Sequence, residues 1–283
     1  MNSDMLNKMI QIFISAFNFP GTNWESILIA IVLGIIFGSI WLALYRTPLF
    51  HKPWLWEMAI VSAILTWTAI AFIQIPLQNW TGQTLLCFWN ARTLTQWILL
   101  AAIPQILLSG LVQEASKLVP VLFYWWRNKK AFTPKFGLIV GAISGAGFGV
   151  FEAIWEHNQI FASGWTWNLV ETTGLTALLG FWERLFAVAL HIATSALVGY
   201  GLAKRKGLQF YLIASFLHGL TNYSVVLLQT NHLTSIQAEI YLTAISVSAT
   251  IVTLWLRWHK PKEIPVDDTP VILPDTTPQT PMN

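Results

Sequence analysis

Long apolar runs separated by short polar segments dominate the chain. Seven of these runs reach the length of about 20 residues that an α-helix needs to cross a hydrocarbon core about 30 Å thick. They cover residues 26–45, 54–77, 94–126, 137–155, 174–203, 208–228 and 234–258. The pattern predicts an all-α protein, a polytopic transmembrane helical bundle of about seven spans, with its transmembrane domain over residues 24–258.

The two ends of the chain lack a run of that length. Within residues 1–23, the apolar stretch is short and is interrupted by Gln11 and Asn18, which favours an interfacial segment over a signal peptide. Residues 259–283 are rich in Pro and Thr and contain little apolar surface to bury. We expect this segment to be a disordered cytoplasmic tail.

The composition excludes an ordinary soluble enzyme. Hydrophobic residues make up 55% of the 283 residues and charged residues only 10%, whereas a soluble domain carries about 25% charged residues. The excess of 16 Lys and Arg over 13 Asp and Glu comes from short clusters between the runs, which indicates phospholipid headgroups as partners and no nucleic acid. The single cysteine, Cys87, excludes a disulfide framework and a multi-cysteine metal site.

The basic clusters also predict the orientation, because Lys and Arg accumulate in cytoplasmic loops. They follow the first, third and fifth runs, and the loops between the clusters hold few basic residues. The clusters are Arg46 and Lys52; Arg127, Lys129, Lys130 and Lys135; and Lys204, Arg205 and Lys206. Seven spans then place the N-terminus outside and the C-terminus in the cytoplasm.

Among the polar residues inside the apolar runs, where a charged group costs about 2.5–3.5 kcal/mol even on the gentler insertion scale, six are candidates for a functional site. They are Glu114, Lys117, Glu152, His191, His218 and Asn222. The steps from Glu114 to Lys117 and from His218 to Asn222 are close to one helical turn, so each pair shares a helix face.

The depths of these residues agree. Counted from the cytoplasmic end of each span at about 1.5 Å per residue, the depth in the membrane is roughly 16 to 23 Å for Glu114, Glu152, His191, His218 and Asn222. Four helices therefore offer carboxylates, imidazoles, an ammonium and an amide near one plane, which predicts a site between spans three to six. The structural alternative is that each polar residue has its own packing partner.

These residues stand in motifs that resemble the PrsW and YhfC-like intramembrane proteases, relatives of the CAAX prenyl endopeptidases and bacteriocin-immunity membrane proteins. The resemblance extends from Gln113 to Asn222, within the spans over 94–228. It implies an intramembrane endopeptidase, a transmembrane or membrane-anchored protein substrate, and a bacterial cytoplasmic membrane. The motifs are Gln113-Glu114 with Lys117; Gly145, Gly147 and Phe148 with Glu152; Arg184 and His191 before Gly199-Tyr200-Gly201; and His218 with Asn222.

Two positions depart from the family pattern. Gln113 stands where the family has the first Glu of a pair, and Ala153 stands where an Asn often follows the second-motif Glu. The second Glu of the pair is present as Glu114, with Lys117 one turn away to hold it ionised. We therefore expect Glu114 to be the base.

Peptide hydrolysis needs a water, a base and donors to the oxyanion, and the six residues supply these in two ways. In a glutamate-dependent version without a cofactor, Glu114 activates the water, Glu152 and His191 orient it, and His218 and Asn222 bind the oxyanion. In a metal-dependent version, Glu152, His191 and His218 hold a zinc ion and Glu114 is the base.

Two other classes of function remain open at this stage. Buried Glu, His and Lys also serve proton- or ion-coupled carriers, and the change at Gln113 keeps open a catalytically silent scaffold or immunity protein. Glu183 and Arg184 are interpreted as a structural ion pair, and Glu239 is expected to reach water and is assigned no chemistry. The four-residue spacing of Gly141, Gly145 and Gly149 favours close helix packing.

Overall fold

The computed structural model describes residues 3–15, 21–129 and 132–259 of the chain. All regular structure within these ranges is helical. The elements are α1 (Ser3–Ser15), α2 (Trp24–Tyr45), α3 (Trp54–Ala69), η1 (Ile70–Gln74), α4 (Ile75–Phe88), α5 (Ala91–Gln96), α6 (Ile98–Ala101), α7 (Ile103–Arg127), α8 (Pro134–Ala162), α9 (Trp167–Thr173), η3 (Gly174–Leu178), α10 (Leu179–Ala203), α11 (Gly207–Gln229) and α12 (Ser235–Trp258).

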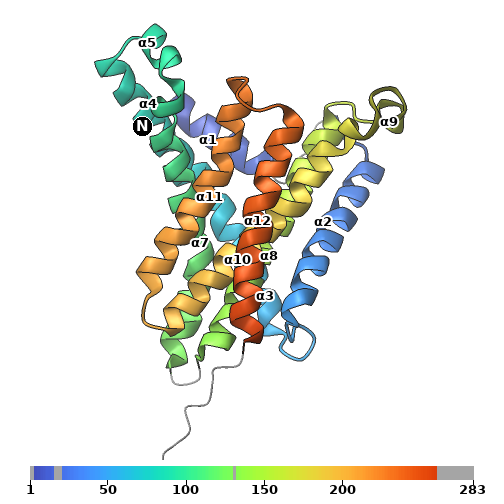
Figure 1. The fold of residues 1–283 in the computed structure, drawn as a ribbon, viewed down its shortest axis with the longest axis vertical. Helices are drawn as coiled ribbons and strands as arrows, with labels where there is room; N and C mark the ends of the chain where they lie inside the picture. Colours follow the sequence, from blue (N-terminus) through green and yellow to red (C-terminus); the bar gives the residue numbers. More distant parts are fainter. Residues whose placement is uncertain (1–2, 16–20, 130–131, 260–283) are drawn as a thin grey trace, which may run out of the picture.

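The prediction of an all-helical protein with seven spans is confirmed for the described residues. Seven helical stretches are long and apolar enough to cross a membrane, and each overlaps one of the predicted runs. The second differs most from its prediction, because it continues from Trp54 to Phe88 through η1. The ends of α2, α7 and α10 next to the basic clusters lie at the lower end of Figure 1, and which end faces the cytoplasm stays a prediction.

Helices α8 and α10 form the centre of the bundle, with the other long helices around them (Figure 1). Glycines on α8 allow this close approach, because a Cβ atom at Gly141 or Gly145 would collide with the backbone carbonyl of Ser195 or His191 on α10. The prediction of close packing from the glycine spacing is thus confirmed at these positions. Side chains such as Leu138, Val188 and Ile192 fill the surrounding core.

A π-helical segment, η1, interrupts the second span. Pro76 follows it at the start of α4, and proline cannot donate the backbone hydrogen bond that a regular helix requires. A π-bulge inserts a residue and rotates the helix that follows. Gln74, at the end of η1, is thereby buried against α7.

Helix α1 accounts for the described part of the predicted interfacial segment. It runs obliquely to the long helices (Figure 1), and Trp67 on α3 donates a 3.1 Å hydrogen bond from Nε1 to the carbonyl of Phe13. Its place in the interface stays a prediction, and residues 16–20 of that segment lie outside the described residues. The predicted cytoplasmic tail lies outside them from residue 260 onward.

Candidate active site

Four buried polar side chains meet in the middle of the bundle. Glu114 and Lys117 come from α7, His191 from α10 and His218 from α11, and each is at most 3% exposed. Three helices thus deliver a carboxylate, an ammonium and two imidazoles to one point, as their common depth in the sequence predicted.

Glu114 is the hub of this cluster. Its Oε1 accepts a 2.6 Å hydrogen bond from Lys117 Nζ and a 3.1 Å bond from Thr194 Oγ1, and it lies 2.8 Å from His218 Nδ1. Its Oε2 is also buried but has no hydrogen-bond partner among the described residues. One oxygen therefore holds the cluster together while the other is available to a ligand.

The contacts of His191 define its tautomer. Its Nδ1 lies 3.0 Å from Lys117 Nζ, and an ammonium can only donate, so Nδ1 accepts and Nε2 carries the proton. Nε2 lies 2.9 Å from Glu152 Oε2 on α8, which accepts that proton's hydrogen bond. By the same reasoning His218 donates from Nδ1 to the Glu114 carboxylate, which leaves its Nε2 as an acceptor.

Glu152 connects the cluster to a second charged group. Its Oε2 accepts a 3.2 Å hydrogen bond from Arg184 Nη1, and Arg184 also pairs with Glu183 through Nη2. The predicted Glu183–Arg184 ion pair is therefore present, but Arg184 additionally contacts a residue of the site. The Glu152 side chain is 19% exposed, whereas Glu114 and Lys117 are fully buried, so Glu152 lies at the edge of the cluster.

Two of the motif residues make contacts elsewhere. Asn222 donates a 3.0 Å hydrogen bond from Nδ2 to Ser109 Oγ on α7. Gln113, at the position where the family has a Glu, donates a 3.1 Å bond from Nε2 to Gln74 Oε1. The Gln113 change is thus accommodated by a second amide, which the π-helical segment supplies.

Three hydroxyl and amide groups that sequence reasoning missed support the site. Thr194 binds Glu114, Ser144 donates a 2.6 Å hydrogen bond to the carbonyl of Lys117, and Gln74 accepts from Gln113. Thr194 could have been found, because it follows His191 by three residues and so shares its helix face. Ser144 and Gln74 carry no comparable signal.

Three of the buried side chains have the chemistry and spacing of metal ligands. Glu114, His191 and His218 each offer a ligand atom, and these atoms lie within 4.8 Å of one another. Two imidazoles, one carboxylate and an open position form a catalytic zinc shell, and the unpartnered Glu114 Oε2 agrees with this use. These three residues differ from the predicted ligands in one position, because Glu114 takes the place of Glu152. Glu152 instead binds His191 from outside the group, as do carboxylates that orient metal-bound histidines.

The fold and the site together define a polytopic membrane protein with a carboxylate–histidine centre buried inside its helical bundle. A sequence model of the PrsW family intramembrane metalloproteases matches residues 51–254. The match covers more than half of the chain and includes every residue of the centre, so the chain belongs to this family, as the motifs predicted. No curated protein and no solved structure matches the chain.

Proposed function

We propose that the centre around Glu114 hydrolyses a peptide bond in, or next to, a membrane-embedded segment of a protein substrate. One observation carries the proposal. A carboxylate in contact with an ammonium and an imidazole is fully buried in the bundle, yet one of its oxygens has no partner. Most buried side-chain oxygens in folded proteins have a hydrogen-bond partner, so the unpartnered Oε2 supports the use of this carboxylate to bind a ligand.

In this proposal Glu114, His191 and His218 would hold a zinc ion, which suits mixed nitrogen and oxygen ligands. His191 would bind it through Nδ1, in place of the present contact of that atom with Lys117 Nζ. A bound zinc would supply a Lewis acid that polarises the scissile carbonyl and lowers the pKa of water. Glu152, at the partly exposed edge of the cluster, accepts the proton from the attacking water and returns it to the leaving amine. Its present contact with His191 Nε2 fixes the orientation of that ring.

Lys117 and Asn222 have supporting roles. Lys117 Nζ, bound to Glu114 Oε1, keeps that carboxylate ionised. Asn222 lies one turn from His218 on α11, and its Nδ2 donates one hydrogen bond to Ser109; its second Nδ2 proton would be the donor to the oxyanion. In the glutamate-dependent version no cofactor binds, and the free Glu114 Oε2 is the base.

The test uses the purified full chain in lipid and a panel of single-span membrane peptides, with products mapped by mass spectrometry. We expect wild type to cleave at least one peptide, Glu114→Gln to cleave none, and the matched control Glu171→Gln on the exposed helix α9 to cleave normally. Cleavage retained in Glu114→Gln would reject the assignment. Failure of wild type on the whole panel would favour a carrier or a silent scaffold.

The cellular setting is also a proposal. We infer from the positions of the basic clusters that the C-terminal end of α12 faces the cytoplasm, and the family resemblance supports a bacterial cytoplasmic membrane. Labelling of single cysteines introduced at Lys52 and at Glu171, which lie in segments proposed to face opposite sides of the membrane, tests the orientation in sealed vesicles.

A further inference from the structure

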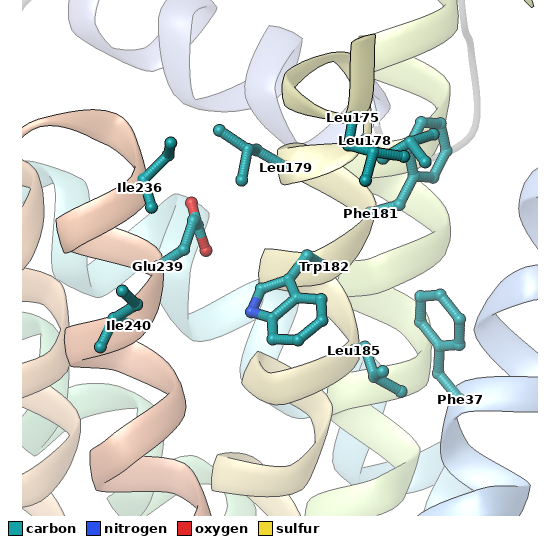
Figure 2. Close-up of a pocket in the computed structure, with 10 residues that line it drawn as sticks. All are labelled: Phe37, Leu175, Leu178, Leu179, Phe181, Trp182, Leu185, Ile236, Glu239 and Ile240. Carbon is teal, nitrogen blue, oxygen red and sulfur yellow. The ribbon is translucent and has the colours of Figure 1, made fainter. Parts of the chain in front are cut away.

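An apolar groove opens between α10 and α12, away from the catalytic cluster. Its volume is about 600 Å³, and Figure 2 shows Leu179, Trp182 and Leu185 on one wall with Glu239 and Ile240 opposite. The Nε1 of Trp182 donates a 2.9 Å hydrogen bond to Thr243 Oγ1 on α12, which joins the two walls. Apart from Glu239, the described residues that line the groove are apolar or aromatic.

Glu239, which was expected to reach water, is partly exposed. Its Oε2 is buried and has no hydrogen-bond partner among the described residues, and its carboxylate points into the groove in Figure 2. A carboxylate oxygen in apolar surroundings requires a donor. The one N–H donor among the other lining side chains, Trp182 Nε1, is bound to Thr243, so a donor on the occupant of the groove would stabilise this carboxylate.

The surroundings of Glu239 carry more carboxyl groups than cations. Arg184 is bound to Glu152 and Glu183 and lies within electrostatic reach of Glu156 and Glu239. Four carboxyl groups from α8, α10 and α12 thus share the positive charge of one guanidinium. This balance attracts a cationic group and repels a lipid phosphate.

Helix α10 contributes residues to both the groove and the catalytic cluster. Leu185 lines the groove and precedes His191 by six residues, which is about 9 Å along the helix axis. Arg184, next to Leu185 on α10, contacts both Glu183 and Glu152, and Glu152 contacts His191. A chain of polar contacts thus links the groove side of α10 to the Glu114 centre.

We propose that this groove binds the apolar segment of the protein substrate and that Glu239 pairs with a basic side chain at the membrane boundary of that segment. A lipid acyl chain would fill the apolar walls but offers Glu239 no donor, whereas a Lys or Arg side chain on a peptide helix offers one. The inference rests on the proposed function and names its substrate class, an apolar segment flanked by a basic residue.

The test compares cleavage of three single-span peptides that carry Lys, Ala or Glu at one boundary position. We expect wild type to cleave the Lys peptide about tenfold more efficiently than the Ala peptide, on the scale of a partly desolvated charge pair. Glu239→Gln should lose this preference, and Glu239→Lys should transfer it to the Glu peptide. Glu171→Lys on α9 is the matched control and should keep the wild-type preference.

A second measurement detects docking without cleavage. A photo-crosslinking residue in place of Ile240, whose side chain forms part of the groove wall, should capture the Lys peptide more strongly than the Glu peptide. Cleavage that is indifferent to the boundary residue, or crosslinks formed only with lipid or with a second copy of the chain, would overturn the docking proposal and leave the proposed function intact. Charge-dependent crosslinking without cleavage of any peptide would support the groove and reject the proposed function.

Discussion

Lys117 Nζ lies 2.6 Å from Glu114 Oε1, and neither side chain has any exposed surface. The two residues are three positions apart on α7 and share one face of it. A buried ion pair gains little over apolar residues of similar volume, but removal of only one partner leaves an uncompensated charge in the interior. Substitutions at Glu114 therefore change both the chemistry and the stability of the protein.

The first prediction separates these two effects. Glu114→Gln should lower the free energy of unfolding by about 3–5 kcal/mol, because Lys117 then carries a buried charge without a counterion. The double variant Glu114→Gln/Lys117→Met should recover most of this stability, since both charges are gone. Chemical unfolding in bicelles measures the stability, and the peptide panel measures cleavage.

Cleavage should stay absent in the double variant if Glu114 takes part in the reaction. A double variant that regains both stability and cleavage would show that the pair is only structural. Lys117→Met alone completes the comparison. It removes the ammonium but leaves the Glu114 carboxylate in contact with His218 and Thr194, so its stability shows the cost of losing the other partner of the pair.

The second prediction concerns the identity of the metal ligands. Glu114→Gln and His218→Ala should each abolish zinc retention through purification, because each removes a member of the group within 4.8 Å. Glu152→Gln should retain zinc with an affinity lower by about 10–100-fold, the effect of changing a carboxylate that orients a ligand. Metal content by mass spectrometry measures all three.

The same measurement distinguishes the alternatives. Zinc lost completely in Glu152→Gln but kept in Glu114→Gln would restore the ligand set of Glu152, His191 and His218. Absence of bound zinc from active wild-type protein, with chelators having no effect on cleavage, would favour the glutamate-dependent mechanism.

The sequence predicts the position of each site residue along its helix axis well, but not which side chain it contacts. The common depth of Glu114, Glu152, His191 and His218 follows from counting residues along straight helices, and the structure brings these four into one network. Which carboxylate joins the two histidines depends on how each helix is rotated about its axis. Rotation is decided by packing between helices, which residue counting does not contain.

Two local features explain the contacts of Gln74 and Ser144, which the sequence did not predict. Gln74 reaches Gln113 because the π-helical segment before Pro76 changes the register of the second span, and a hydrophobicity pattern does not reveal a one-residue insertion. Ser144 reaches the Lys117 carbonyl because α8 packs between α7 and α10. Serine is common in membrane helices, so it gave no signal on its own.

The third prediction tests Arg184 as a positioning residue. Arg184→Met removes a charge-assisted hydrogen bond to Glu152 and should reduce kcat/KM by about 10–100-fold, the range for residues that orient a metal-bound histidine through a second contact. Arg184→Lys should recover only part of the loss, because a lysine cannot bridge Glu152 and Glu183 with two planar donors. A pH profile of kcat/KM provides the discriminating readout.

In that profile, the limb that reports the ionisation of Glu152 should shift along the pH axis in the Arg184→Met variant. A protein that is only destabilised would keep the wild-type profile at lower amplitude. Lys135→Met, in the basic segment at the start of α8, is the control for loss of one positive charge. An unchanged profile together with an unchanged kcat/KM would remove Arg184 from the active site.

The fourth prediction concerns the distance between α8 and α10, which determines whether Glu152 on α8 reaches His191 on α10. A Cβ atom at Gly141 would collide with the Ser195 carbonyl of α10, so Gly141→Ala should force the helices apart. Overpacking of this kind costs about 1–3 kcal/mol, more than the gain of about 1 kcal/mol in helix propensity from glycine to alanine. We expect lower stability and, because the Glu152–His191 contact of 2.9 Å lengthens, slower cleavage.

Gly82→Ala provides the matched control, since its added Cβ would meet only the flexible end of Gln105 at 3.4 Å. That variant gains helix propensity without moving a backbone, so its free energy of unfolding should stay equal or rise. Unfolding in bicelles and cleavage of the same peptide measure both variants. A Gly141→Ala protein as stable and as active as Gly82→Ala would show that the approach of α8 to α10 does not determine the geometry of the site.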